Sequence, residues 1–482
     1  MKCNKINIHN TLSASYRFDS SYHLSDAISF RYLQQKLPYE NVPIRDVVER
    51  VFLGNIFSRI FVKDKEYGVP YLAASDTVLA NLDTNRYLSK KQSQDLNYLK
   101  LHKDWILITC SGTIGNVTFT NSKFEGRIAT HDLIRVIPND SKMLKGALYA
   151  YLASKFGYCQ LTQSKFGGVV KHINADHVYD ITIPLFPKTL QIKINDLIQE
   201  SAKLREEASI MIETAKSILL NYCNADFRKD NFKTAVVKNI DILSSLQHRI
   251  DPPALINDGV ITINKIKEIK KTIKLKDTGA KVFRPGIFKR CYVNNGYPYI
   301  KGSDIFNVNP FVRCSYLSRK NTPFVNEMLL HEGQILVTCA GSVGNIKLIT
   351  KEYDDKEALG SQDIIRIETT NNLFTKEYLF IYLQLPFVYD YIQSMKYGSV
   401  IERVEPFHIE SIPVVQPTVK ISEEITSLVR RYMECTYKAF VEEETAIKEV
   451  EQEIESWKNK RRTYSIDKYG KNICTQIFWR PC

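Results

Sequence analysis

The chain has 482 residues, which is more than one ordinary hydrophobic core supports, so two or more domains are expected. With 44% hydrophobic and 11% aromatic residues, the composition excludes a disordered protein. The formal net charge of +13 favours a polyanionic partner, nucleic acid before an anionic membrane, although a basic solvated surface has the same balance.

The ten cysteines are scattered and form no Cys-x-x-Cys pair, so neither a zinc ribbon nor a redox motif is predicted. The first residues, MKCNKINIHNTL, lack the apolar core of a signal peptide. No run approaches the roughly 18 apolar residues of a membrane span. A cytoplasmic protein with reduced thiols and no membrane partner is therefore expected.

Up to residue 187, short β-branched and aromatic runs such as WILITC, NVTFT and LIRVI alternate with turn residues and predict strands. One helix, around Leu148–Leu161, interrupts them. Between two of the strands lies SGTIG, residues 111–115, which lacks the Lys-Ser/Thr ending of a phosphate-binding P-loop. We interpret it as a turn in which glycine supplies positive φ, with hydroxyls that are able to contact phosphate.

A long helix is predicted after Pro187, a position where proline starts a helix rather than interrupting one. Apolar and small residues recur at spacings of four and three, which predicts a heptad seam with charged residues on the other faces. The seam consists of Leu197, Ser201, Leu204, Ala208, Met211, Ala215, Ile218 and Tyr222.

Beyond this helix, segments similar to those of the first half recur in the same order, offset by about 230 residues. GVPYLAASD corresponds to GYPYIKGSD, ILITCSGTIGNV to ILVTCAGSVGNI, and FGGVVKHINADHV to YGSVIERVEPFHI. Order and spacing kept over this length indicate a tandem duplication of a whole domain, not a short solenoid repeat. A second internal helix is predicted around Leu379–Gln393.

A second long helix follows Pro417, and its seam slips near Phe440 as a stutter does. The narrow seams and the length of both helices favour a coiled coil between them over separate packing on their own domains. The second seam consists of Ile421, Ile425, Leu428, Tyr432, Cys435, Ile447, Val450, Ile454 and Trp457.

The predicted fold class is α+β: two duplicated globular domains with mixed sheets and helices, each followed by a long helix, the two helices forming an antiparallel coiled coil. The expected domains are a first recognition domain (1–187), a first spacer helix (188–225), a second recognition domain (226–416), a second spacer helix (417–463) and a basic tail of unknown role (464–482).

No catalytic set is evident. DPPA at Asp251 lacks the aromatic residue with which an amino-group methyltransferase stacks a flipped base, and its repeat counterpart is DSSY, so we interpret it as a domain-entry turn. His177 and His408 correspond in the repeat and are interpreted as core or capping residues. The basic run from Lys265 has no counterpart in the first half and is interpreted as a charged helix face.

Basic residues recur at corresponding places beside the glycine turns and beside an aromatic residue, Phe166 or Tyr397. Groups of this kind suit a loop that contacts phosphates and bases, although each residue alone fits a solvated loop equally well. The candidate DNA-binding residues are Arg86, Lys90, Lys91, Ser111, Thr113, Lys165, Lys171 and His172 in the first half, and Arg319, Lys320, Ser342, Lys396, Tyr397 and Arg403 in the second.

From Tyr16 to about Arg462, this plan resembles the specificity subunit of Type I restriction–modification enzymes. The resemblance rests on the paired SGTIGNV and AGSVGNI, on GVPYLAASD and GYPYIKGSD, and on the IPLFP and IPVV stretches before the long helices. It implies that each globular part reads one half of a split DNA site, and because the two halves are similar but not identical we expect that site to be asymmetric. It also implies that the helices set the distance between the halves and dock two methyltransferase subunits. The tail YSIDKYGKNICTQIFWRPC departs from the pattern.

The resemblance further implies no active site and no cofactor in this chain. S-adenosylmethionine, Mg and ATP would belong to partner subunits, which include ATP-dependent restriction subunits where the system has them. Two alternatives stay open from the sequence alone: a self-contained nuclease or methyltransferase, and a scaffold that binds only protein.

Overall fold

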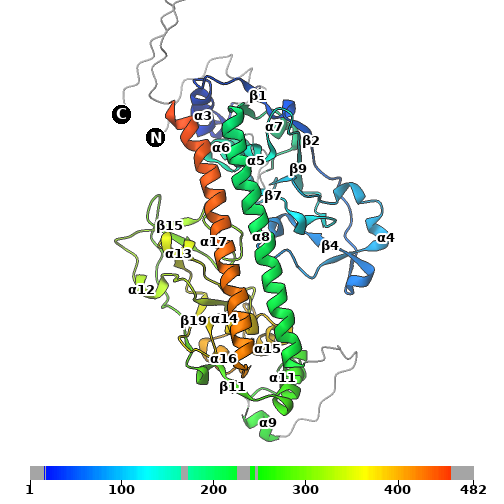
Figure 1. The fold of residues 1–482 in the computed structure, drawn as a ribbon, viewed down its shortest axis with the longest axis vertical. Helices are drawn as coiled ribbons and strands as arrows, with labels where there is room; N and C mark the ends of the chain where they lie inside the picture. The colour runs from blue at the N-terminus through cyan, green and yellow to red at the C-terminus, as the bar shows by residue number, and fades with distance from the viewer. Residues whose placement is uncertain (1–15, 17, 164–171, 225–238, 245–247, 458–482) are drawn as a thin grey trace, which may run out of the picture.

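The computed structural model describes residues 16, 18–163, 172–224, 239–244 and 248–457. Two long helices run side by side along the longest axis, and two globular parts flank them (Figure 1). The first half lies mainly beside the upper part of the helix pair in this view, and the second half beside the lower part. None of the helices in the described ranges is long and apolar enough to cross a membrane.

Each half contains the same strands in the same order. Those of the first half are β1 (Asn41–Pro43), β2 (Val48–Phe52), β3 (Phe61–Val62), β4 (Gly68–Leu72), β5 (Tyr87–Ser89), β6 (Ile106–Thr109), β7 (Val117–Phe119), β8 (Ile128–Ala129), β9 (Leu133–Pro138) and β10 (Thr182–Pro184). Those of the second are β11 (Thr272–Lys274), β12 (Lys281–Phe283), β13 (Tyr292–Val293), β14 (Tyr297–Ile300), β15 (Ser315–Leu317), β16 (Ile335–Thr338), β17 (Ile346–Leu348), β18 (Leu359–Gly360), β19 (Ile364–Glu368) and β20 (Pro413–Val415).

The strands pair identically in the two halves. The first half has sheets ordered β2-β9-β6-β7, β3-β5-β4-β8 and β1-β10, and the second has β12-β19-β16-β17, β13-β15-β14-β18 and β11-β20. The strands are antiparallel except for β4 with β8 and β14 with β18, which are parallel. This equivalence confirms the predicted duplication and the mixed sheets.

Most of the α-helices repeat around these sheets, although two of the second half, at residues 325–328 and 351–355, lie where the first half has the short 3-10 helices Asn97–Leu99 and Ser122–Phe124. In the first half they are α2 (Ser20–His23), α3 (Asp26–Gln34), α4 (Lys90–Ser93), α5 (Lys145–Ala153), α6 (Lys155–Gln163), α7 (Ala175–Tyr179) and α8 (Lys188–Cys223). After α9 (Asn239–Ser244), the second half has α10 (Pro252–Leu255), α11 (Asp258–Ile269), α12 (Val325–Met328), α13 (Lys351–Asp355), α14 (Lys376–Leu383), α15 (Pro386–Ser394), α16 (Pro406–Glu410) and α17 (Val419–Ser456).

Two helix predictions were wrong in detail. Each predicted internal helix is two helices, α5 and α6 in the first half, and α14 and α15 in the second. The first breaks at Ser154, whose backbone is extended, and the second breaks at Leu385, which is extended because Pro386 follows it. The run from Lys265 has no basic counterpart in the first half, although the helix in which it begins does have one. The run lies in and after α11, which packs on α15 as α3 packs on α6.

The long helices α8 and α17 are antiparallel, since contacts pair Lys193 with Glu449 near one end and Tyr222 with Gln416 near the other. Each helix completes the core of the other half. Ile212, Ala215, Leu219 and Cys223 of α8 lie in the second core, and Ala446, Val450 and Ile454 of α17 lie in the first. The two halves therefore share their interiors through the helix pair.

The predicted seam follows this packing with small offsets. Leu204 and Met211 on α8 and Ile425 and Ile454 on α17 are buried. Ser201, Ala208, Ala215 and Val450 are buried as well. Partly buried members that pack against the two large cores include Leu197, Ile218, Leu428 and Ile447. Beside the last two, Val429 and Ala446 are fully buried.

Candidate nucleic-acid interface

The two glycine segments are hairpin turns, β6–β7 and β16–β17, as predicted. Their glycines have positive φ: 62° and 81° at Gly112 and Gly115, and 71° and 89° at Gly341 and Gly344. In the first turn the Thr109 hydroxyl donates to the Thr113 carbonyl and accepts from the Asn116 amide, and Thr338 does the same in the second. A Cβ added at Gly112 or Gly341 would meet nothing within 4 Å, so both tips are open.

A second loop lies against each hairpin. The Ile173 amide donates to the Cys110 carbonyl over 3.0 Å, and the Val404 amide donates to the Cys339 carbonyl over 3.0 Å. These contacts bring Ser111 beside His172, and Ala340 beside Arg403. Two candidate segments that are some 60 residues apart in sequence thus form one surface in each half. Lys165, Phe166 and Lys171 lie outside the described residues, as does the tail from residue 464.

The candidate side chains at this surface differ in exposure and in whether another side chain already occupies their polar groups. Thr113 and Ser342 are exposed, whereas the Ser111 hydroxyl donates to the carboxylate of Asp132. Tyr397, which is 39% exposed, donates to Glu405 over 2.8 Å, and this hydrogen bond raises the pKa of Tyr397. Lys396 forms an ion pair with Glu402.

The remaining candidates lie in the other sheet of each half, at the ends of β5 and β15. Arg86 is paired with Asp76, and its guanidinium lies 5.9 Å from the centre of the Tyr71 ring. Arg319 lies 4.3 Å from the Tyr297 ring and 2.7 Å from Glu357, whose pKa it lowers.

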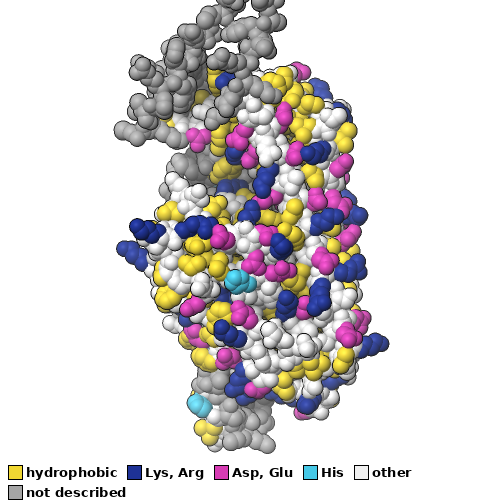
Figure 2. Space-filling model, turned by 60° about the vertical axis from the view of Figure 1, so that its left-hand side comes forward, with side chains coloured by type: hydrophobic (Ala, Val, Ile, Leu, Met, Phe, Trp, Pro, Cys, Tyr) yellow, Lys and Arg dark blue, Asp and Glu magenta, His cyan; other side chains and the backbone are white. Residues whose placement is uncertain are grey.

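Exposed lysines follow at both places: Lys90, Lys91 and Lys320. Within the described ranges no β-bridge or backbone hydrogen bond joins this group to the hairpins. Figure 2 shows Lys and Arg interspersed with Asp and Glu over the visible face, so the excess of positive charge is not gathered there.

The repeated histidines are capping residues, as predicted. The Asn174 amide donates to Nδ1 of His177 over 3.2 Å at the start of α7, and the Glu405 amide donates to Nδ1 of His408 over 2.8 Å at the start of α16. Burial lowers the pKa of His408. In the described part of the chain, no cluster of three His, Cys, Asp or Glu residues is placed to hold a metal ion.

Sequence reasoning missed three arginines. Arg135 and Arg366 correspond in the repeated LIRV and IIRI, a signal that was available, and both are fully buried. Arg313 of the second half donates to the carbonyls of Ile114 and Gly115 in the first hairpin, and no local pattern marks it.

The repeated fold agrees with the comparisons to known proteins. The sequence profile of the family described as "Type I restriction modification DNA specificity domain" matches residues 36–208 and again residues 258–449. Because these regions span more than half of the chain, the protein belongs to this family. It is a DNA-recognition protein, and the alternatives of a self-contained enzyme and of a scaffold without DNA are set aside.

Three solved structures align with most of the chain at low identity. The S subunit of the Type I restriction–modification system from M. genitalium aligns at 14% identity and a TM-score of 0.36, covering 86% of this chain and 98% of that one. The HsdS subunit from Thermoanaerobacter tengcongensis aligns at 13% identity and a TM-score of 0.27, covering 87% and 97%.

A third, described by complex assembly and conformational transition of the type I R-M system, aligns at 13% identity and a TM-score of 0.26, covering 88% and 97%. A search of curated proteins gave no match.

Proposed function

We propose that this protein reads a bipartite, asymmetric site on double-stranded DNA, one segment with each half, and directs partner subunits to it. The observation that carries the proposal is the repeated surface in which an open glycine hairpin lies against a second loop, once in each region matched by the family. Hydroxyls, backbone N–H groups and a basic or aromatic side chain meet there, which are the groups that contact phosphates and base edges.

The site is asymmetric because the two surfaces differ in side chains. The first presents Ser111, Thr113 and His172, and the second presents Ala340, Ser342 and Arg403. Each correctly read base pair contributes roughly 1–3 kcal/mol of discrimination, so two surfaces with fixed separation sum to a much higher specificity than one.

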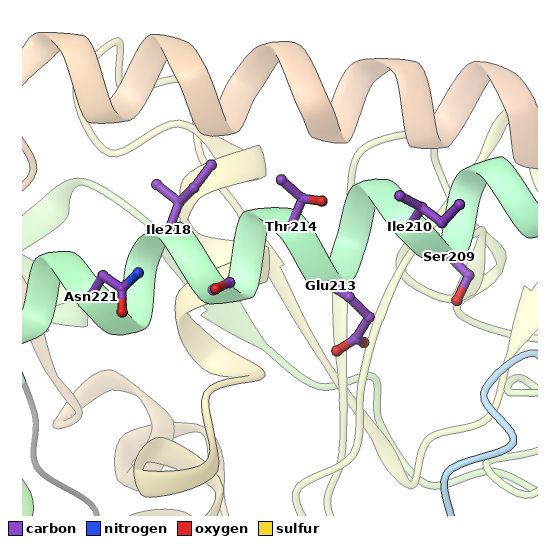
Figure 3. A pocket seen from close by; sticks show the side chains of 7 residues that line it. Ser209, Ile210, Glu213, Thr214, Ile218 and Asn221 are labelled. Carbon is purple, nitrogen blue, oxygen red and sulfur yellow. The ribbon is translucent and has the colours of Figure 1, made fainter.

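The partners of the proposal are DNA and methyltransferase subunits, two of them, docked along the helix pair. ATP-dependent restriction subunits join where the system contains them. The chain itself needs no cofactor, and S-adenosylmethionine, Mg and ATP belong to the partners. Figure 3 shows residues of α8 that line a shallow pocket, and the exposed Ile210 (66%) and Glu213 among them leave this stretch of the helix accessible for such contacts. The domain limits stated above remain part of this proposal.

The first test separates phosphate contacts of the two halves. We expect Arg403→Ala and Lys171→Ala to weaken duplex binding, each lowering the dependence of log K on log salt by about one unit, because one released counterion is lost per phosphate contact. Arg45→Ala is the matched control, since Arg45 is exposed, is paired with Asp180, and belongs neither to the hairpin nor to the loop that lies against it. Unchanged affinity and slope in both variants would contradict the assignment of these loops.

The second test concerns the partners. Purification of the tagged, full-length chain from its native cell should recover a methyltransferase in a ratio of about two to one, by analogy with the bipartite site it serves. Recovery of the chain alone, with intact duplex binding, would contradict the proposed assembly and leave DNA reading in place.

A further inference from the structure

The two halves touch each other directly, away from the helix pair. Residues 78–80 of the first half and 306–308 of the second form an antiparallel bridge. The Val308 amide donates to the Val78 carbonyl over 2.8 Å, and the Ala80 amide donates to the Phe306 carbonyl over 2.9 Å. This bridge holds the next turn of the second half against the first hairpin.

Arg313 extends from that turn onto the first hairpin. Its guanidinium donates to the Ile114 carbonyl over 3.1 Å and to the Gly115 carbonyl over 2.9 Å, and it lies 4.1 Å from the centre of the Tyr158 ring. The residue has a φ of 57°, a left-handed conformation that is unfavourable for a side chain of this size. The chain thus adopts a strained turn where Arg313 reaches the hairpin of the other half.

The second hairpin is supported differently. The carbonyl of Val343, which corresponds to Ile114, accepts a hydrogen bond of 2.8 Å from the side chain of Gln393 on α15. Gln393 belongs to the same half as the hairpin. Its counterpart in the first half is Thr162, whose hydroxyl is turned back to the Tyr158 carbonyl over 2.9 Å. The first half has no donor of its own at this carbonyl among the described contacts, and Arg313 supplies it.

We propose that Arg313 is a positioning residue for the first DNA-reading hairpin, so that the second half sets how the first half reads its segment. The inference rests on the proposed function, because it takes the hairpin to face DNA. It ties the first hairpin to the second half, whereas the second hairpin is held by Gln393 of its own half.

The contact of Arg313 with the first hairpin is tested without DNA, by hydrogen exchange of the full-length protein. Arg313→Ala should speed exchange of the first-hairpin amides by about tenfold or more, equivalent to about 1.4 kcal/mol, and leave the second hairpin unchanged. Gln393→Ala, the matched control, should do the reverse. Unchanged exchange at Gly115 and Asn116 in Arg313→Ala, or an equal rise in both hairpins, would overturn the proposal.

A rescue variant separates positioning from general loss of packing. Thr162→Gln in the Arg313→Ala background gives the first half the same side-chain donor that Gln393 supplies in the second half. The neighbouring ring is also equivalent, because Tyr158 corresponds to Tyr389. We expect slow exchange of the first hairpin to return. If exchange stays fast in a folded double variant, the carbonyl donor is not what positions the hairpin, and the proposal is overturned.

The consequence for DNA is tested on duplexes altered in one half-site at a time. Arg313→Ala should reduce discrimination among sequences at the segment read by the first half by about tenfold, and leave discrimination at the other segment unchanged. If exchange becomes faster as expected but discrimination at both segments is intact, Arg313 does position the hairpin, and the proposed role of the hairpin in reading DNA is contradicted.

Discussion

At the scale of single residues, two buried arginines organise the sheets that carry the hairpins. Arg135 and Arg366 are 0% exposed, and burial lowers the pKa of each to about 10. Neither has a carboxylate among its hydrogen-bond partners. Each donates to four equivalent carbonyls. Those of Arg135 belong to Leu133, Ala129, Thr130 and Leu99, and those of Arg366 belong to Ile364, Gly360, Ser361 and Met328. Each guanidinium thus ties β9 or β19 to the segment that precedes it.

The first prediction is that Arg135→Met and Arg366→Met each destabilise the protein by about 3–5 kcal/mol, because four buried carbonyls lose a donor. Urea unfolding followed by circular dichroism measures this. Arg45→Met, at an exposed ion pair, is the control and should change the free energy of unfolding by less than about 1 kcal/mol. Equal effects of buried and exposed variants would show that the carbonyl contacts add nothing.

Lys123 gives a prediction for pH. Its ammonium donates to the Ala80 carbonyl, beside the bridge between the halves, and burial with the nearby Arg127 lowers its pKa to about 8. A lysine with a depressed folded pKa binds fewer protons when folded than when unfolded between about pH 8 and pH 10.4. Stability from this group therefore rises with pH in that window.

We expect the free energy of unfolding of wild type minus that of Lys123→Met to increase between pH 8 and pH 10, by about 1–3 kcal/mol. Taking the difference cancels the tyrosines and cysteines, which titrate in both proteins. A difference that is flat across this window would contradict the lowered pKa.

At the scale of elements, a polar group fixes how α8 and α17 pair. Glu443 on α17 is 5% exposed, accepts from the Tyr149 hydroxyl of α5, and lies 2.7 Å from Nη2 of Arg205 on α8. Burial and the adjacent Glu443 raise the pKa of Tyr149. The corresponding positions in the other half are Phe380, Ile212 and Thr436, so this group exists once. It distinguishes the two ends of an otherwise repetitive helix pair.

Replacing one of Glu443, Arg205 and Tyr149 should lower the free energy of unfolding far more than replacing all three together. Arg205→Met leaves Glu443 buried without its cation and should cost about 3–5 kcal/mol, whereas Arg205→Met with Glu443→Leu and Tyr149→Phe should recover most of that loss. Unfolding of the single, double and triple variants gives the coupling energy. If the losses simply add, the three side chains do not act as one group.

The sequence is sufficient for elements whose signal is local. Both hairpins, both long helices and the capping role of His177 and His408 follow from spacing and repetition within short windows. The buried group of Tyr149 and Glu443 joins residues 294 apart, and the contact of Arg313 with Ile114 joins residues 199 apart. Pairings at that distance depend on how the whole chain packs, so no window of sequence contains them.

At the scale of the whole molecule, the helix pair and the bridge together set the separation of the two halves. The sequence alone suggests that lengthening α8 would lengthen the gap between half-sites. The packing adds a condition, because Lys193–Glu449 and Glu200–Lys438 hold α8 and α17 in register along their length. If the helix pair sets the gap, α8 and α17 both have to be lengthened to change it.

Four residues inserted after Ala208 and four after Tyr432 should lengthen the unread gap by about two base pairs, because four helical residues add about 6 Å and base pairs are about 3.4 Å apart. The same displacement breaks the bridge between the halves and the contact of Arg313 with the first hairpin, so discrimination at the first segment should fall as it does in Arg313→Ala. Methylated sites mapped in cells with the partner methyltransferase report the gap. The single insertion in α8 is the comparison and should abolish activity by breaking the register. A constant gap with activity retained would refute the ruler.

The exchange of helix ends between the two cores has a consequence for assembly from separate pieces. Each half lends its helix to the other, as two subunits of a domain-swapped dimer do, but within one chain. Two copies of the second half, pairing with each other, would bury Glu443 against Phe380 and Thr436, with no arginine to neutralise it. Two copies of the first half would bury the Tyr149 hydroxyl beside Ile212, with no acceptor. When a first half pairs with a second half, both the Glu443 carboxylate and the Tyr149 hydroxyl have their partners. Separately produced halves should therefore associate with each other in preference to a second copy of themselves.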